Sequence, residues 1–145
     1  MIRLEGEALL RLIEVRRSLE LEVVRKAAVN ARPKQRREIS RLCDELLTEV
    51  YSHRPWRPAD AAFHGAIYEA AGNPMFGQII ASLVFAFERS SESPFGSDDF
   101  GMDSFPPHRK LADAIVAGDA DRAIVAISQI LDLVEKEVRQ IVGIE

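Results

Sequence analysis

The fold and chemistry of this 145-residue chain centre on one stretch, Asp60-Ala-Ala-Phe63-His64-Gly-Ala-Ile67-Tyr-Glu-Ala70-Ala71-Gly72-Asn73-Pro74. As a helix, this stretch places Asp60 and His64 four residues apart, so a carboxylate and an imidazole project from the same face. Phe63 and Ile67 share that face, and the polar pair therefore points toward the apolar interior. Because a buried carboxylate is costly without a cation or a hydrogen-bond donor, we expect a partner opposite Asp60.

The ends of this helix are marked by residues with special backbone properties. Pro58 suits a first helical turn, where a missing N–H group costs nothing. Gly72-Asn73-Pro74 predicts a left-handed C-terminal cap, followed by a residue that cannot continue the helix. The predicted element is therefore a short helix between two proline-containing segments.

Helical spacing of apolar residues continues on both sides of this element. It predicts helices over residues 7–30 and from Pro33 to Val50, and a helix after Pro74. It also predicts one that Pro107 opens and Gly118 stops, and a last one capped by Asp119. The apolar residues of the helix after Pro74 are expected in the core or in a subunit interface; they are Phe76, Ile79, Ile80, Leu83, Val84 and Phe87. The sequence thus predicts an all-α fold, an antiparallel bundle of about six helices.

Residues 90–106 lack this regular pattern and are rich in Ser, Gly, Asp and Pro. A segment of this length is usually a functional lid or a disordered insertion, and disorder is the interpretation that we favour. The apolar faces of the helices exceed what a six-helix monomer needs to bury, so a homodimer is expected.

Composition excludes several classes of protein. The net charge of −4 argues against a domain whose whole surface binds nucleic acid. The basic residues between Arg32 and Arg41 are expected to form a solvated helix face. Cys43 is the only cysteine, which rules out an intramolecular disulfide. Its position in the apolar spacing of the second helix predicts a small core residue. We find no apolar run that could span a membrane and no export signal, so a cytoplasmic location without a membrane partner is expected.

The first helix carries a charged pair, Arg16 and Glu20, within its apolar stripe. One interpretation is a buried ion pair that satisfies itself, or a helix that rotates to release it. The other is that Arg16 faces a cavity and binds an anion with its planar guanidinium group.

Asp60, His64 and His108 are the set of residues that could form a metal site. One carboxylate oxygen and two imidazole nitrogens suit Zn²⁺ or another divalent first-row ion. The alternative is a core histidine that simply pairs with Asp60. The sequence has no glycine-rich phosphate loop, no nucleophile with a neighbouring base and no pair of inward carboxylates, so an enzyme is not predicted.

Several motifs in register resemble a known family. They are Leu12-Ile-Glu14-Val-Arg16-Arg17-Ser-Leu19-Glu20, the Asp60–Ile67 and Ala70–Pro74 segments, His108 leading to Ala114-Ile115, Gly118-Asp119 and Ala123. Together they resemble the FCD domain, the ligand-sensing C-terminal domain of FadR-type regulators in the GntR family of bacterial transcription regulators.

This resemblance implies an FCD-like domain over residues 1–145, with a helical bundle that dimerises and binds a small effector in a central cavity. The winged helix-turn-helix that normally precedes this domain is expected to be absent from the chain, because residue 1 already matches the start of the FCD region. Operator DNA would then be contacted only through that missing domain.

The resemblance also implies a divalent metal, held in many members by an aspartate and three histidines. Asp60, His64 and His108 match three of these positions, whereas Ile130 occupies the fourth and cannot ligate a metal. The effector could therefore bind a three-ligand metal, or bind without metal as in the fatty-acyl-sensing branch. We expect a small carboxylate effector held in part by Arg16; the alternatives are a metal-dependent enzyme and a purely structural dimerisation module.

Overall fold

A computed structural model describes residues 2–90 and 101–143 of the chain. These residues form six α-helices and one short 3-10 helix, without any strand. In chain order the elements are α1 (Ile2–Asn30), α2 (Pro33–Tyr51), α3 (Arg57–Ala70), α4 (Pro74–Ser90), η1 (Met102–Ser104), α5 (Phe105–Ala117) and α6 (Ala120–Val142). The predicted all-α class is confirmed.

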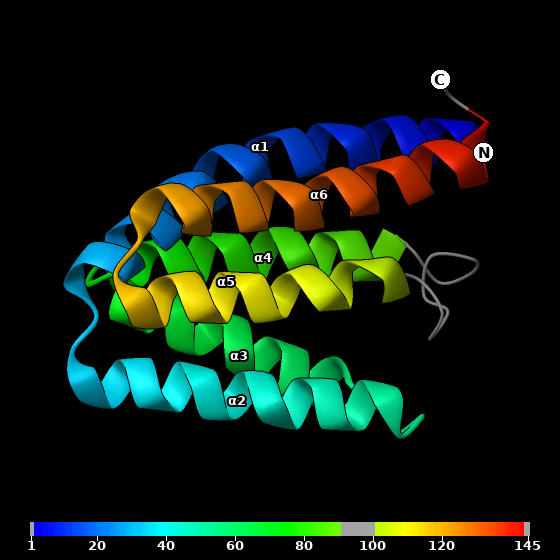
Figure 1. Ribbon diagram of the computed structural model, residues 1–145. Helices are drawn as coiled ribbons and strands as arrows, with labels where there is room; N and C mark the ends of the chain where they lie inside the picture. The colour runs from blue at the N-terminus through cyan, green and yellow to red at the C-terminus, as the bar shows by residue number, and fades with distance from the viewer. Residues whose placement is uncertain (1, 91–100, 144–145) are drawn as a thin grey trace.

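The helices lie side by side in a bundle (Figure 1). Helices α1 and α6 pair along one edge, and α2 and α3 pair along the opposite edge. Between them, α5 contacts both α6 and α2, while α4 packs against α1 and α3. The core joins residues from every helix, and its largest fully buried side chains include Phe63, Ile67, Ile80, Phe105, Leu111 and Leu131.

The predicted helix ends agree with the backbone. Gly72 and Gly118 adopt left-handed conformations with φ values of 86° and 72°, which end α3 and α5 at low conformational cost. At the start of α6, the Asp119 carboxylate accepts a hydrogen bond of 3.1 Å from the Arg122 backbone N–H. These local signals therefore place the turns of the bundle correctly.

Two predicted boundaries are wrong. The first helix begins at Ile2 rather than at residue 7, and buried Gly6 packs so closely on Val142 of α6 that a Cβ atom there would clash. Because Val142 belongs to the last helix, the apolar spacing within residues 7–30 could not reveal this contact. The contact lies before residue 7, where the apolar spacing of the first helix was predicted to begin.

The irregular segment was also predicted too long at its C-terminal side. Residues 102–104 form η1, and α5 begins at Phe105 instead of Pro107. Phe105 is buried against Trp56, with ring centroids 4.8 Å apart, and the prolines after it occupy the first turn, where they are tolerated. The predicted disorder or lid function of residues 91–100 lies outside the described part of the chain.

Other side chains lie where the sequence predicts them. Cys43 is fully buried, and burial raises the pKa of its thiol to about 11, as expected of an inert core residue. Among the basic residues near the start of α2, Arg36 is partly buried, and its guanidinium donates to the Ile115 carbonyl at the end of α5. The other four are exposed: Arg32, Lys34, Arg37 and Arg41.

No described helix combines the length and the apolar character that crossing a membrane requires.

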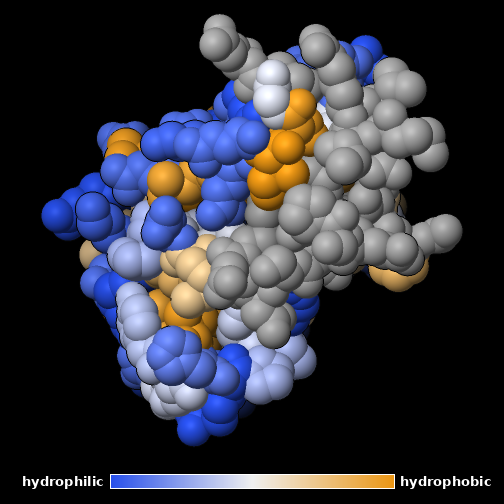
Figure 2. Space-filling view, turned by 90° about the vertical axis from the view of Figure 1, so that its right-hand side faces the viewer, coloured by the Kyte–Doolittle hydropathy of each residue, from blue (hydrophilic) through white to orange (hydrophobic). Residues whose placement is uncertain are grey.

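The apolar face of α4 is only partly covered. Ile80 is buried, whereas Ile79 is 45% exposed and Phe85 is 62% exposed; the side chain of Phe87 lies outside the described set. The part of this end of the bundle that Figure 2 shows in colour is mostly hydrophilic, with smaller hydrophobic areas. Helix α4 therefore keeps apolar side chains at the surface that this single chain does not bury.

Candidate functional site

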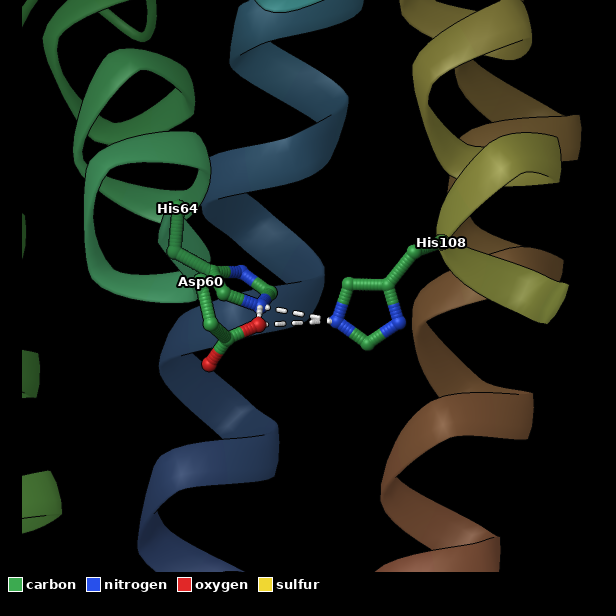
Figure 3. Close-up of side chains that lie close together, drawn as sticks. All are labelled: Asp60, His64 and His108. Carbon is green, nitrogen blue, oxygen red and sulfur yellow. Dashed lines mark hydrogen bonds and ion pairs between the residues drawn. The ribbon is translucent and has the colours of Figure 1, made fainter. Parts of the chain in front are cut away.

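The three predicted metal ligands converge from two helices (Figure 3). Asp60 and His64 project from successive turns of α3, and His108 projects toward them from the first turns of α5. The two histidine side chains are 8% and 3% exposed, while that of Asp60 is 29% exposed. The cluster therefore lies inside the bundle, with its carboxylate nearest to solvent.

The ligand atoms form a nearly equilateral triangle. Oδ1 of Asp60 lies 3.3 Å from Nε2 of His64 and 3.2 Å from Nε2 of His108, and the two Nε2 atoms lie 3.1 Å apart. No other group of three such residues in the described ranges comes together in this way. The structure thus brings together all three residues that the spacing could only suggest.

The backbone fixes the tautomer of His108. Its Nδ1 lies 2.6 Å from the carbonyl oxygen of Ser104, which can only accept a hydrogen bond, so Nδ1 carries the hydrogen. In the neutral ring, the lone pair then lies on Nε2 and faces Asp60 and His64. Metal-binding histidines commonly have this arrangement, in which a carbonyl orients the ring.

The size of the triangle suits a first-row divalent ion. Bonds of about 2.0–2.1 Å to Zn²⁺, meeting at angles between about 90° and 110°, separate neighbouring ligand atoms by about 2.8–3.4 Å. All three observed separations fall within this range. The donor set, one carboxylate oxygen and two imidazole nitrogens, is also one that zinc binds in proteins.

The charges of the cluster shift the pKa values of its members. Burial alone would raise the pKa of Asp60, but interactions with His64 and His108 outweigh it and hold that pKa far below its usual range. Burial disfavours the charged form of His64, yet the Asp60 carboxylate prevails and raises the pKa of this imidazole. Without a metal, the cluster therefore attracts a proton, which a divalent ion must displace.

Aromatic rings surround the two imidazoles. The ring centroid of Phe63 lies 5.2 Å from that of His64 and 5.7 Å from that of His108, and Phe105 lies 5.2 Å from His108. These contacts restrict the rotation of both imidazoles. Asp60, the most exposed of the three residues, marks the side of the cluster nearest to solvent.

On that side lies a pocket of ≈ 820 Å³ between α3 and α4, with part of its wall from α1. Its polar lining includes Arg16, Asp60, His64 and Tyr68, and much of the remainder is apolar. A Cβ atom added at Gly65 would meet nothing within 4 Å, so the absence of a side chain there widens the pocket. This pocket reaches the candidate metal ligands, but it lies between α3 and α4 and opens to solvent, whereas the resemblance implied a central cavity.

Arg16 both pairs with Glu20 and reaches the pocket. Its Nε lies 3.6 Å from Oε1 of Glu20, and its side chain is 18% exposed. Burial would lower the pKa of Arg16, but Glu20, Tyr68 and Asp60 raise it. The two interpretations of this pair are therefore compatible, because the ion pair exists and the guanidinium group still lines the pocket.

Ile130 lies in the buried core, 3% exposed, on the inner side of α6. A hydrocarbon side chain offers no ligand atom. From the described residues, the cluster can therefore supply the three ligands Asp60, His64 and His108.

Sequence reasoning missed two supporting residues. Tyr68 lies one turn beyond His64 on the same face of α3, and its hydroxyl donates to Glu20 on α1. The four-residue spacing of Asp60, His64 and Tyr68 indicates that all three share one face of a helix, and it could have identified Tyr68 from the sequence. Ser104 precedes His108 by four residues, but the segment was predicted to be irregular, so its backbone contact could not be foreseen.

The chain also matches known proteins. The sequence fits the FCD domain over residues 11–133. The chain belongs to the FCD family. This FCD domain is 27% identical over 124 residues to an uncharacterized HTH-type transcriptional regulator, YcbG, of Bacillus subtilis (strain 168). The alignment covers 85% of the chain and 51% of the relative, so the FCD domain spans about half the length of that protein. The family match over residues 11–133 contains Arg16 and all three candidate ligands.

Proposed function

We propose that this FCD domain is the effector-sensing and dimerisation part of a GntR-type transcription regulator and binds a small carboxylate through a divalent metal ion. The observation that carries the proposal is the triangle of Asp60, His64 and His108, whose ligand atoms lie 3.1–3.3 Å apart. The family match and the HTH-type relative support the regulatory role. A cytoplasmic location stays a prediction.

The metal would polarise and hold the carboxylate of the effector. Asp60, His64 and His108 would hold the ion, and a first-row divalent ion with three protein ligands would have coordination positions left for the effector. Arg16 lines the same pocket and offers guanidinium hydrogens to an anion. The apolar parts of the pocket wall, including Ile80 and Val84, would contact the remainder of the effector.

Effector binding would act on a homodimer. The exposed apolar side chains of α4, among them Met75, Ile79 and Phe85, are suited to a second copy of the chain. Since α3 and α4 line the pocket and α4 carries these side chains, an effector could favour one dimer arrangement over another. DNA-binding segments outside this sequence would transmit the change to an operator.

Elemental analysis and calorimetry test this function. We expect the purified domain to contain about one equivalent of a divalent metal, and carboxylates to bind the zinc-loaded protein but not the metal-free protein. Tight carboxylate binding to metal-free protein, or failure to bind zinc, would contradict the proposal.

Sedimentation tests the dimer and should show it at micromolar concentration. A turnover assay tests the alternative: a metal-dependent product that His64→Ala abolishes would favour an enzyme instead.

A further inference from the structure

Behind the pocket wall lies a carboxylate to which the proposed function assigns no role. Glu20 of α1 is fully buried, and its Oε1 accepts a hydrogen bond from the Tyr68 hydroxyl and lies 3.6 Å from Nε of Arg16. Burying a carboxylate is costly unless a cation or strong donors compensate it. One cation, Arg16, and one hydroxyl donor, Tyr68, therefore face Oε1 of Glu20 inside the protein.

Its partners connect Glu20 to the pocket. Arg16 and Tyr68 line the pocket beside Asp60 and His64, and the ring of Tyr68 stacks on that of His64 with centroids 6.3 Å apart. Nε of Arg16 and Oε2 of Glu20 are buried and have no hydrogen-bond partner among the described residues. Glu20 therefore neutralises Arg16 by charge without occupying the Nε donor of the guanidinium group.

The charges around the pocket can be counted. Arg16 contributes one positive charge, and Glu20 and Asp60 contribute one negative charge each. With neutral imidazoles the sum is −1, and a divalent ion changes it to +1. Arg57 and Glu69, which also line the pocket, carry opposite charges and cancel in this count. One negative charge on the effector balances the site, whereas a second would have no countercharge in this count.

We propose that Glu20 determines the charge class of the effector, so that the metal-loaded domain selects monocarboxylates over dicarboxylates. This inference rests on the proposed function, because it places the effector carboxylate beside the metal and Arg16. Glu20 itself does not touch the effector in this arrangement. Tyr68 acts as a positioning residue, because its hydroxyl holds Glu20 against Arg16.

Calorimetry with two matched pairs of ligands tests the inference on the zinc-loaded domain. The pairs are butyrate with succinate and 2-hydroxybutyrate with malate, which differ by one carboxylate at equal chain length. We expect the wild type to bind each monocarboxylate about tenfold more tightly than its partner, the scale of one uncompensated charge at the effective dielectric of a protein site. In Glu20→Gln, which removes the charge at nearly constant shape, this ratio should shift about tenfold toward the dicarboxylate.

Two control variants separate charge from packing. Glu20→Asp keeps the charge and should keep the wild-type ratio, while Tyr68→Phe removes the hydroxyl without changing charge and should weaken both members of a pair equally. A wild type that prefers dicarboxylates overturns the inference whether or not any variant folds. An unchanged ratio in folded Glu20→Gln also overturns it but leaves the proposed function standing, whereas failure of all four carboxylates to bind zinc-loaded wild type contradicts both.

Discussion

Two polar clusters lie next to each other in the interior of this FCD domain, and they differ in what they lack. The cluster of Asp60, His64 and His108 directs one carboxylate oxygen and two imidazole nitrogens at one point and contains no permanent cation. The neighbouring cluster of Arg16, Glu20 and Tyr68 contains its own cation and pairs it with a carboxylate. The first arrangement favours a metal ion or a proton, whereas the second is largely balanced and supports the protein without an added group.

The largest expected effect comes from removing a ligand of the first cluster. His108→Ala should lower zinc affinity by at least about 100-fold, because losing even an outer partner of a ligand costs about 10–100-fold. Competition with a chelator measures the affinity. His53→Asn is the matched control, since His53 is exposed and its positive φ of 56° is tolerated by asparagine. Unchanged zinc affinity in His108→Ala would show that this cluster is not the metal site.

In the second cluster, Arg16→Ala should separate stability from metal binding. Glu20 would remain buried without its cation, which we expect to cost about 3 kcal/mol of unfolding free energy in denaturant titrations. Binding of 2-hydroxybutyrate to zinc-loaded protein should weaken at least about tenfold, while zinc content stays the same. Combining Arg16→Ala with Glu20→Gln should restore stability but not ligand binding. Loss of zinc in Arg16→Ala would contradict the separation of the two clusters.

The pH dependence should distinguish metal-free from metal-bound protein. Because the pKa of His64 is raised, its protonation stabilises the metal-free fold below the ordinary value of about 6.5, and this contribution is lost as pH rises through the raised value. Zinc requires the unprotonated ring, so zinc affinity should fall about tenfold per pH unit below that value. The increase in Tm caused by zinc should therefore shrink from pH 8 to pH 5.5. An equal increase at both pH values would argue against imidazole ligation.

Ile130→His tests whether the first cluster is incomplete. Ile130 is buried on the inner side of α6, so a histidine there adds an imidazole to the interior. If this position faces the ligands, zinc affinity should rise about tenfold or more, as expected of a fourth protein ligand. Ile130→Gln is a control of comparable polarity. A histidine variant that folds and binds zinc no better than the glutamine variant would show that α6 does not contribute a ligand position.

The smallest effect is expected at Gly65, a pocket-lining residue without a side chain. Gly65 is exposed in the middle of α3, and an added methyl group would meet no atom within 4 Å. Gly65→Ala should therefore raise stability by about 0.5–1 kcal/mol through helix propensity alone, with unchanged zinc affinity. Gly65→Leu should fill the pocket and weaken carboxylate binding. Denaturant titration measures the stability of both variants, and calorimetry measures their carboxylate binding. A destabilised Gly65→Ala variant would contradict the prediction, because it would mean that the added methyl group meets other atoms.

Local sequence signals determined most of the secondary structure. Proline at the start of α3, left-handed glycines at Gly72 and Gly118, and the Asp119 cap depend on interactions within a few residues, so the chain order alone reveals them. Helical spacing also determined that Asp60 and His64 share one face. It placed Arg16 and Glu20 on the inward face of α1 for the same reason.

Only the tertiary structure decided what these side chains meet. His108 is 44 residues from His64, and Tyr68 is 48 residues from Glu20, yet their polar atoms are in contact. The early starts of two helices likewise depend on distant residues. At the start of α1, Gly6 packs on Val142, and at the start of α5, Phe105 packs on Trp56. Helix periodicity fixes which direction a side chain points. The packing of one helix on another fixes the distance between the side chains, and only that distance brings Asp60, His64 and His108 together as one candidate metal site.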